Sequence, residues 1–330
     1  MYSEQLNVIY ASDNTFANIM GVSIVSLFES NFECKIQLYI LDSKISDENR
    51  IKIEKVCKKY KQKLPIWLQA VNVEDKLNMR VVNDRGSISQ YSRMLIENVV
   101  PDSVNRVLYL DCDTLITDSL TDFFNLNMDG NIIAALKDAF SKYYRINIDL
   151  NENDVMFNSG VMLIDMNKWR KYRVEDKLLN FIRVKKGVIQ QGDQGVLNAI
   201  LSKYTKIIDA RYNTISTFYE LTYKQLIKYR KPVNFYSEQQ VKQACDNPAI
   251  IHFTSSFYSI RPWCRNCQHP QVRYWRYYKS ISPWSGYPLQ KDSREKIKRI
   301  INFLSLNSFI GVACFFQVYF RPFKNYFLKK

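Results

Sequence analysis

Residues 106–113 read Arg-Val-Leu-Tyr-Leu-Asp-Cys-Asp, an apolar run that two aspartates follow at once. A short apolar run of this kind is typical of a buried strand. Because residues i and i+2 of a strand point to the same face, Asp111 and Asp113 are expected to share one cation. Carboxylate oxygens suit Mg²⁺ or Mn²⁺, ions that bridge protein carboxylates to phosphates. The stretch therefore predicts a strand that ends at a metal site; two solvated aspartates are the alternative.

Further apolar runs on both sides of this stretch predict additional buried strands. They are residues 6–11, 36–41, 66–71, 132–136, 161–164, 206–209 and 249–253. Apolar residues recur at helical spacing over residues 16–31, and Ser46 is expected to cap a second helix that ends before Pro65. Alternating strands and helices predict a doubly wound α/β domain with a mainly parallel sheet. Ligands of such sheets bind beyond the carboxyl ends of the strands.

Composition and missing motifs exclude several classes of protein. The 330 residues include 46% hydrophobic and 24% charged residues, which excludes a disordered or fibrous chain. No Gly-x-Gly-x-x-Gly or Walker A motif occurs, which disfavours a dinucleotide-dependent dehydrogenase and a P-loop NTPase. The first residues lack the pattern of a secretory signal, and the seven scattered cysteines fit a reducing compartment. We therefore expect a cytoplasmic protein.

Three polar motifs are expected at the same edge of the sheet as the aspartate pair. Phe-Asn-Ser-Gly at 157–160 opens the run 161–164. Gln-Gly-Asp-Gln at 191–194 begins a predicted helix, with Asp193 in its first turn, where the helix dipole favours a carboxylate; simple capping is the alternative. His252 ends a predicted strand and suits a third metal ligand, although a lone histidine is usually structural.

Several short motifs occur in one order along the chain. They are Tyr-Ala-Ser-Asp at 10–13, Tyr-Ser-Arg at 91–93 ahead of Leu-Tyr-Leu-Asp-Cys-Asp at 108–113, then Phe-Asn-Ser-Gly, Gly-Asp-Gln at 192–194 and Ile-Ile-His-Phe at 250–253. In this order they resemble glycosyltransferase family 8, the retaining nucleotide-sugar transferases that include bacterial lipooligosaccharide galactosyltransferases and glycogenin. The resemblance covers about residues 6–265. It implies a GT-A-type, single Rossmann-like nucleotide-binding domain.

The resemblance also implies a role for each candidate residue. Asp111, Asp113 and His252 would hold Mn²⁺ or Mg²⁺. The nucleotide-sugar would be bound by Ala11, Ser12, Asp13, Thr15, Phe16, Arg93, Asp111, Cys112, Asn158 and Arg261. Catalysis would involve Asp138, Asp193 and Gln194, with Gln194 on the reacting face of the anomeric carbon. The chain departs from the family pattern at Ser255 and at a longer loop, 257–260, just before Arg261.

The last seventy residues differ in charge from the rest of the chain. They carry 14 Lys and Arg against two acidic residues, within a net charge of +15. Residues 303–320 contain no charge, but include polar residues and have basic flanks on both sides. This pattern favours a helix that lies on anionic lipid over one that spans the bilayer, and it suits nucleic acid less well. We therefore predict a transferase domain at 1–265 and a membrane-association region at 266–330, bound peripherally to the inner face of the cytoplasmic membrane.

These features, with what the resemblance to family 8 implies, predict a metal-dependent retaining hexosyltransferase. It would move galactose or glucose from a UDP-sugar to a lipid-linked oligosaccharide in lipopolysaccharide, O-antigen or capsule biosynthesis, and no nucleic acid partner is expected. One alternative is a glycogenin-like primer that glucosylates one of its own 22 tyrosines. The other is a non-catalytic membrane- or nucleic-acid-binding protein with a degenerate transferase domain.

Overall fold

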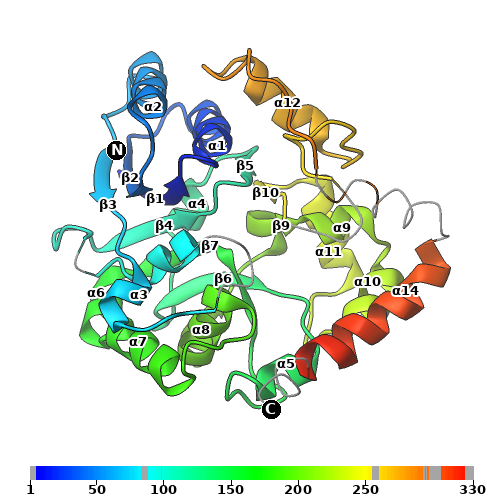
Figure 1. The fold of residues 1–330 in the computed structure, drawn as a ribbon. Helices are drawn as coiled ribbons and strands as arrows, with labels where there is room; N and C mark the ends of the chain where they lie inside the picture. The colour runs from blue at the N-terminus through cyan, green and yellow to red at the C-terminus, as the bar shows by residue number, and fades with distance from the viewer. Residues whose placement is uncertain are drawn as a thin grey trace.

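A seven-stranded sheet lies at the centre of the computed structural model, which describes residues 5–82, 88–97, 99–254, 260–292, 294, 296 and 306–323 (Figure 1). The strand order is β3-β2-β1-β4-β7-β6-β8. The strands are β1 (Leu6–Asp13), β2 (Ile36–Ser43), β3 (Ile66–Gln69), β4 (Arg106–Leu110), β6 (Ile133–Lys137), β7 (Phe157–Asp165) and β8 (Thr205–Ile207). All neighbouring pairs are parallel except those that involve β7. The predicted α/β fold with a mainly parallel sheet is confirmed.

The direction of β7 decides which of its residues reach the ligand-binding edge. This strand runs antiparallel to both β4 and β6. Its first residues, including Asn158 and Gly160, therefore lie at the carboxyl edge of the parallel strands. The Asp111 amide, directly after β4, donates to the Gly160 carbonyl over 2.8 Å. The Phe-Asn-Ser-Gly motif thus reaches the predicted edge from the beginning of its strand.

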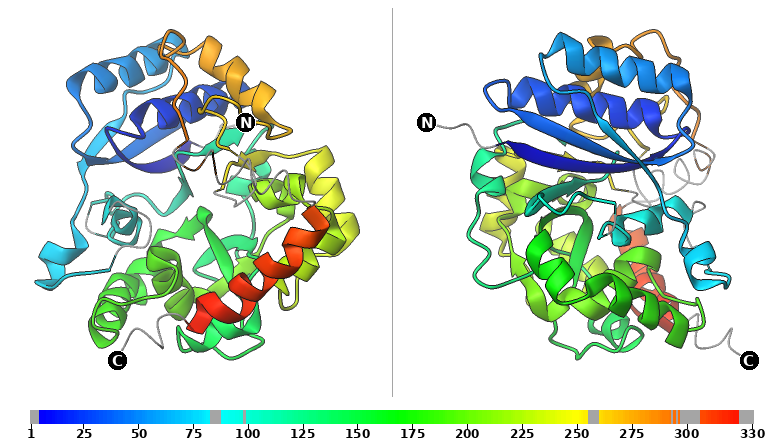
Figure 2. Two further views of the ribbon diagram at one scale, coloured as in Figure 1. Left: turned by 45° about the vertical axis from the view of Figure 1, so that its right-hand side comes forward. Right: turned by 90° about the vertical axis from the view of Figure 1, so that its left-hand side faces the viewer.

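Helices cover both faces of the sheet (Figure 2). They are α1 (Ala17–Ser30), α2 (Asp47–Lys59), α3 (Val73–Leu77), α4 (Thr121–Phe124), α5 (Lys142–Ile146), α6 (Met166–Lys171), α7 (Val174–Val184), α8 (Gly192–Leu201), α9 (Ser216–Glu220), α10 (Tyr223–Arg230), α11 (Glu238–Asp246), α12 (Val272–Ser280) and α14 (Leu306–Cys314). Successive β1 side chains belong to different cores: Val8 and Tyr10 pack with α1 and α2, whereas Ile9 packs with α7 and α8. Ser46 caps α2, as predicted, by accepting from the Asn49 amide.

A second, three-stranded sheet joins distant parts of the chain beside the first. It consists of β5 (Thr114–Ile116), β10 (Ile250–His252) and β9 (Thr214–Ile215), in that order. His252 pairs with Thr114, the residue after Asp113, and β9 runs parallel to β10. This pairing places His252 beside the aspartates, more than a hundred residues away in sequence.

The residues beyond 265 pack on the same core. Trp284 is fully buried against Gly21 of α1, and its Nε1 atom donates to the Asn49 side chain over 2.8 Å. Helix α14 continues into a π-helical turn, Phe315–Phe320, and lies alongside α10 (Figures 1 and 2). Ile310 and Val318 are buried there. Residues on both sides of position 265 therefore pack on one core. The separate role in membrane association that we predict for residues 266–330 stays a prediction.

Within the described ranges, no helix has both the length and the apolar character needed to cross a membrane. Part of the predicted C-terminal pattern, at 297–305, lies outside the described residues, as do Ser255 and the loop 257–259.

Candidate active site

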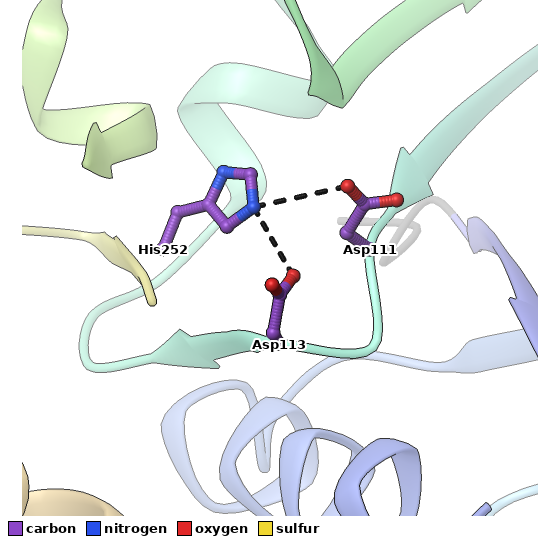
Figure 3. Close-up of side chains that lie close together, drawn as sticks. All are labelled: Asp111, Asp113 and His252. Atoms are coloured by element: carbon purple, nitrogen blue, oxygen red, sulfur yellow. Dashed lines mark ion pairs between the residues drawn. The ribbon is translucent and has the colours of Figure 1, made fainter. Parts of the chain in front are cut away.

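Two carboxylates and an imidazole converge where β4, β5 and β10 meet (Figure 3). The Nε2 atom of His252 lies 3.1 Å from Asp113 Oδ1 and 3.7 Å from Asp111 Oδ2. The three ligand atoms all lie within 4.8 Å of one another. Both aspartates lie in the turn between β4 and β5, not on one face of a continuous strand as the sequence suggested. Their convergence results from this turn and from the pairing of β5 with β10.

Asn213 holds the imidazole in place. Its Oδ1 atom lies 2.9 Å from Nδ1 of His252, and its side-chain amide donates to Asn158 Oδ1 over 3.0 Å. Because an amide oxygen only accepts, Nδ1 donates a proton to Asn213, and Nε2 is the atom that faces the aspartates. Asn213 is fully buried and immediately precedes β9, which pairs with β10. Asn213 therefore fixes the orientation of the imidazole, as the hydrogen-bond partners of metal-binding histidines do.

Gly160 leaves the space that the ligand atoms need. A Cβ atom at this position would lie 2.2 Å from His252 Cε1 and 2.7 Å from Asp111 Oδ2. Any larger residue would displace both side chains. The carboxylate oxygens, the Nε2 atom of His252 and this cradle fit a divalent cation such as Mn²⁺ or Mg²⁺. In the part of the chain that the structure describes, these three residues are the only such group of possible ligands.

Arg93 connects Asp111 of the aspartate pair to helix α8. It lies in the 3₁₀ helix Ile88–Met94, and its guanidinium is 2.8 Å from Asp111 Oδ1 and 3.0 Å from Asp193 Oδ2. The arginine and Asp193 are both buried. Burial lowers the pKa of Arg93, but the nearby charges, Asp111 foremost, outweigh it and raise that pKa. The ion pairs hold the Asp193 carboxylate at the start of α8.

Arg261 occupies the other side of the cluster. Its guanidinium pairs with Asp113 and donates to the Phe253 carbonyl. Burial raises the pKa of Asp113, but the charges of His252 and Arg261 outweigh that effect, so this pKa lies below its ordinary value. Asp113 is therefore ionised at neutral pH, as a metal ligand must be.

A cavity of about 210 Å³ lies beside the turn after β1. Its lining includes the predicted nucleotide-contacting residues Ala11, Ser12, Asp13, Phe16, Arg93, Asp111, Cys112 and Arg261. Thr15 lies outside this cavity: its side chain is exposed, and its amide donates to Asp13 Oδ1 over 2.9 Å. The Cys112 thiol donates to the Ala11 carbonyl over 3.1 Å, which ties the first-strand turn to the aspartate pair.

A larger cavity of about 440 Å³ adjoins the same aspartates. Asp138 lies in its wall and accepts from the side-chain amides of Asn158 and Gln194, each over 3.1 Å. The other end of the Gln194 amide group lies 3.3 Å from the Ser159 amide nitrogen, which donates to it. Asp193 completes this group, so the predicted catalytic residues share one cavity. Asp111, Asp113, Arg93 and Arg261 line both cavities.

Sequence reasoning missed Asn213, Arg230 and Arg321. Asn213 belongs to no motif, and its role becomes visible only through the pairing of β9 with β10. Arg230 and Arg321 line the larger cavity from α10 and from the residue after the π-helical turn. The basic composition of the C-terminal region was the available signal for Arg321, but it carries no information on which surface the charge faces.

Known proteins resemble this chain along most of its length. General stress protein A of Bacillus subtilis (strain 168) is 27% identical over 286 residues, 86% of this chain and 96% of that protein. Lipopolysaccharide 1,2-glucosyltransferase of Escherichia coli (strain K12) is 28% identical over 305 residues, 91% of this chain and 84% of that protein.

Among solved structures, the galactosyltransferase LgtC in complex with donor and acceptor sugar analogs superposes with a TM-score of 0.70 and 23% identity. The match covers 84% of this chain and 96% of LgtC, which shows that the two share a fold. Residues 7–267 match the sequence model of glycosyl transferase family 8, and the chain therefore belongs to that family.

Proposed function

We propose that this protein transfers glucose or galactose from a UDP-sugar to a lipid-linked glycan acceptor, with retention of anomeric configuration, in the synthesis of lipopolysaccharide or a related surface glycan. The observation that carries the proposal is the position of Asp111 and Asp113, which line both cavities. A diphosphate at this junction would place a nucleoside beside the first-strand turn and a sugar beside Asp138. Similarity to a lipopolysaccharide glucosyltransferase supports the choice of donor and acceptor.

Asp111, Asp113 and His252 are the residues that would hold the divalent cation, Mn²⁺ or Mg²⁺. Bound there, the cation would supply positive charge to balance the leaving diphosphate. We assign the same electrostatic task to the Arg261 guanidinium, which lies at the cavity junction. Arg93 orients Asp111 and keeps Asp193 in place through its two ion pairs.

Retention of configuration requires either a covalent intermediate or attack from the face that the leaving group vacates. Gln194 is a poor nucleophile, and both ends of its amide group have hydrogen-bond partners. Asp193 has its carboxylate committed to Arg93. These contacts support same-face attack, in which the leaving phosphate accepts the proton of the acceptor hydroxyl.

The C-terminal helix supports a peripheral position on the inner face of the cytoplasmic membrane. One side of α14 and its π-helical continuation is buried, and the other exposes apolar and aromatic side chains. The exposed residues are Val312, Phe315, Phe316, Tyr319, Phe320 and Phe323. Such a face, within a strongly basic region, suits the interface of an anionic bilayer.

Calorimetric titration of UDP, with and without Mn²⁺, tests the proposed function. We expect metal-dependent binding that the Asp111→Asn/Asp113→Asn variant loses, and that an Asp122→Asn variant, which removes an exposed carboxylate on α4, retains. Screening of UDP-glucose and UDP-galactose against lipid-linked acceptors then identifies the substrates. Absence of UDP binding under every metal condition would refute the proposal. A gain in the mass of the protein itself, with UDP-glucose and no acceptor, would indicate self-glucosylation instead.

A further inference from the structure

Three arginines line the larger cavity without reaching the smaller one. They are Arg230, Arg294 and Arg321, which we name the outer arginines. Arg93 and Arg261, by contrast, line both cavities. The outer arginines therefore belong to the side of the site that faces away from the nucleotide. They come from α10 and from two places in the C-terminal region, so their convergence depends on the packing of that region.

The carboxylates that line the larger cavity make no ion pair with Arg230 or Arg321. Asp111 and Asp193 pair with Arg93, and Asp113 pairs with Arg261. The remaining carboxylate is Asp138, which accepts from amide groups.

Arg294 pairs with the buried Asp292. Neither Arg230 nor Arg321 has a carboxylate within 4.0 Å among the described residues. Two guanidinium charges at the wall of a cavity favour binding of an anion.

The fold holds Arg230 and Arg321 near each other. Arg230 ends α10, and its guanidinium lies 5.7 Å from the centre of the Phe140 ring. The backbone carbonyl of Arg321 accepts from Gln190 Nε2 over 2.9 Å, and Tyr144 Oη donates to the carbonyl of Gln317, one turn earlier, over 2.8 Å. The red α14 segment accordingly runs along α10 toward α5 (Figure 2).

The charges of Arg230 and Arg321 both act on the buried hydroxyl of Tyr144. Burial raises its pKa to about 12, while the positive charges of Arg321 and Arg230 act in the opposite direction. Both guanidinium groups therefore lie within electrostatic reach of one atom.

We propose that Arg230 and Arg321 bind a phosphate group of the acceptor, so that this enzyme selects an anionic acceptor. The inference rests on the proposed function, because it assigns the larger cavity to the donor sugar and the acceptor. The phosphate can belong either to the acceptor glycan or to the diphosphate that joins a glycan to its lipid carrier. Both sources present pairs of phosphate oxygens, to which a planar guanidinium can donate two hydrogen bonds.

The test uses protein saturated with UDP and Mn²⁺, because UDP then blocks the donor diphosphate site. Calorimetry measures binding of glucose 6-phosphate, of a short-chain polyprenyl-diphosphate glycan and of neutral methyl glucoside. We expect Arg230→Gln and Arg321→Gln each to weaken binding of the preferred phosphorylated probe about tenfold, as loss of a charge-assisted hydrogen bond does. Lys228→Gln, which removes an exposed charge from the same helix, should leave binding unchanged. Preference for the monophosphate or the diphosphate probe identifies the source of the phosphate.

Each other result overturns the inference. Phosphorylated probes that bind no better than methyl glucoside, or that bind equally to all variants, would show that the outer arginines do not select an anionic acceptor. An equal loss of UDP affinity in Arg230→Gln and Arg321→Gln would assign these residues to the donor. Wild-type protein that binds UDP and Mn²⁺ but fails these tests refutes only this inference, whereas failure to bind UDP at all refutes the proposed function.

Discussion

The Nδ1 atom of His252 lies 2.9 Å from the Oδ1 atom of Asn213, a fully buried residue at the end of a 3₁₀ helix. This contact selects the tautomer that offers Nε2 to a metal. We expect Asn213→Ala to lower the affinity for Mn²⁺ by roughly 10–100-fold, because partners of metal ligands have effects of this size. Titration of Mn²⁺ followed by electron paramagnetic resonance measures the change. Asn213→Asp keeps the acceptor and should bind Mn²⁺ better than Asn213→Ala; equal affinity in wild type and Asn213→Ala would contradict the assignment.

Gly160→Ala places a methyl group inside the proposed metal site. With 2.2 Å between the new Cβ atom and His252 Cε1, the imidazole must move away from the aspartates. We expect Mn²⁺ affinity to fall by about 100-fold, with loss of metal-dependent UDP binding. Gly286→Ala is the matched control, since a Cβ atom there meets nothing within 4 Å. Normal Mn²⁺ binding by a folded Gly160→Ala protein would show that this cluster does not hold the metal.

Asp193→Asn separates the two routes to retention. Removal of a covalent nucleophile typically costs on the order of 10⁶-fold in turnover, whereas loss of a positioning charge costs far less. Because Asp193 pairs with Arg93, we expect a loss of turnover below about 10³-fold. Steady-state transfer assays measure this loss, and mass spectrometry of the wild-type protein during turnover checks for a glycosyl adduct. An adduct on Asp193, together with an inactive variant, would establish the covalent route.

His269 makes the stability of the protein depend on pH. Burial and the charge of Arg261 lower its pKa from 6.5 to about 4. The unfolded chain therefore binds a proton near pH 6.5 that the folded protein accepts only near pH 4, so stability falls as the pH drops between these values. We expect a loss of about 3 kcal/mol, measured by urea unfolding at pH 7 and pH 4. His269→Phe, which can still pack against Phe253 and Tyr219, should show a smaller loss; identical losses would rule out His269 as the cause.

Exposed aromatic side chains predict binding to anionic lipid. Phe315, Phe316 and Phe320 are each more than half exposed. We expect a Phe315→Ser/Phe316→Ser/Phe320→Ser variant to lose most of its binding to phosphatidylglycerol vesicles in cosedimentation, because each buried aromatic ring contributes about 1.5–3 kcal/mol. Phe32→Ser, which alters a still more exposed ring after α1, is the control. Equal binding by wild type and the triple variant would place the membrane contact elsewhere or refute it.

Most strands were predictable from the sequence because they contain a short apolar run, whereas the very short β5 and β9 were not predicted. Residues 6–11, 107–110 and 249–253, for example, correspond to β1, β4 and β10. The direction of β7 was not predictable, because alternation of side chains is the same when a strand is read either way. The Phe-Asn-Ser-Gly motif was nevertheless placed at the correct edge, although it begins its strand and does not end it.

The residues of the site were predictable only where they belong to short sequence motifs. Asp111, Asp113 and His252 stand beside apolar runs and are therefore conspicuous, and the structure brings all three together. Asn213 is 39 residues from His252, and no local pattern distinguishes it from other asparagines. The position of Arg321 depends on how α14 packs against α10, a tertiary contact that composition cannot specify.

The segment between β6 and β7 begins and ends at the active site. Lys137 pairs with Phe157, and the Asp138 amide donates to the Met156 carbonyl over 2.8 Å, so residues 138–156 leave the sheet and return at one point. Because the entropy of closing a loop grows only slowly with its length, insertions within this segment need not move Asp138 or Asn158. An insertion here would reshape the wall of the larger cavity, which Phe140 lines, and leave Asp138 and Asn158 in place. Because β7 runs antiparallel to β6, both ends of residues 138–156 lie at the same edge of the sheet, and this segment can change in length without a change in the strands.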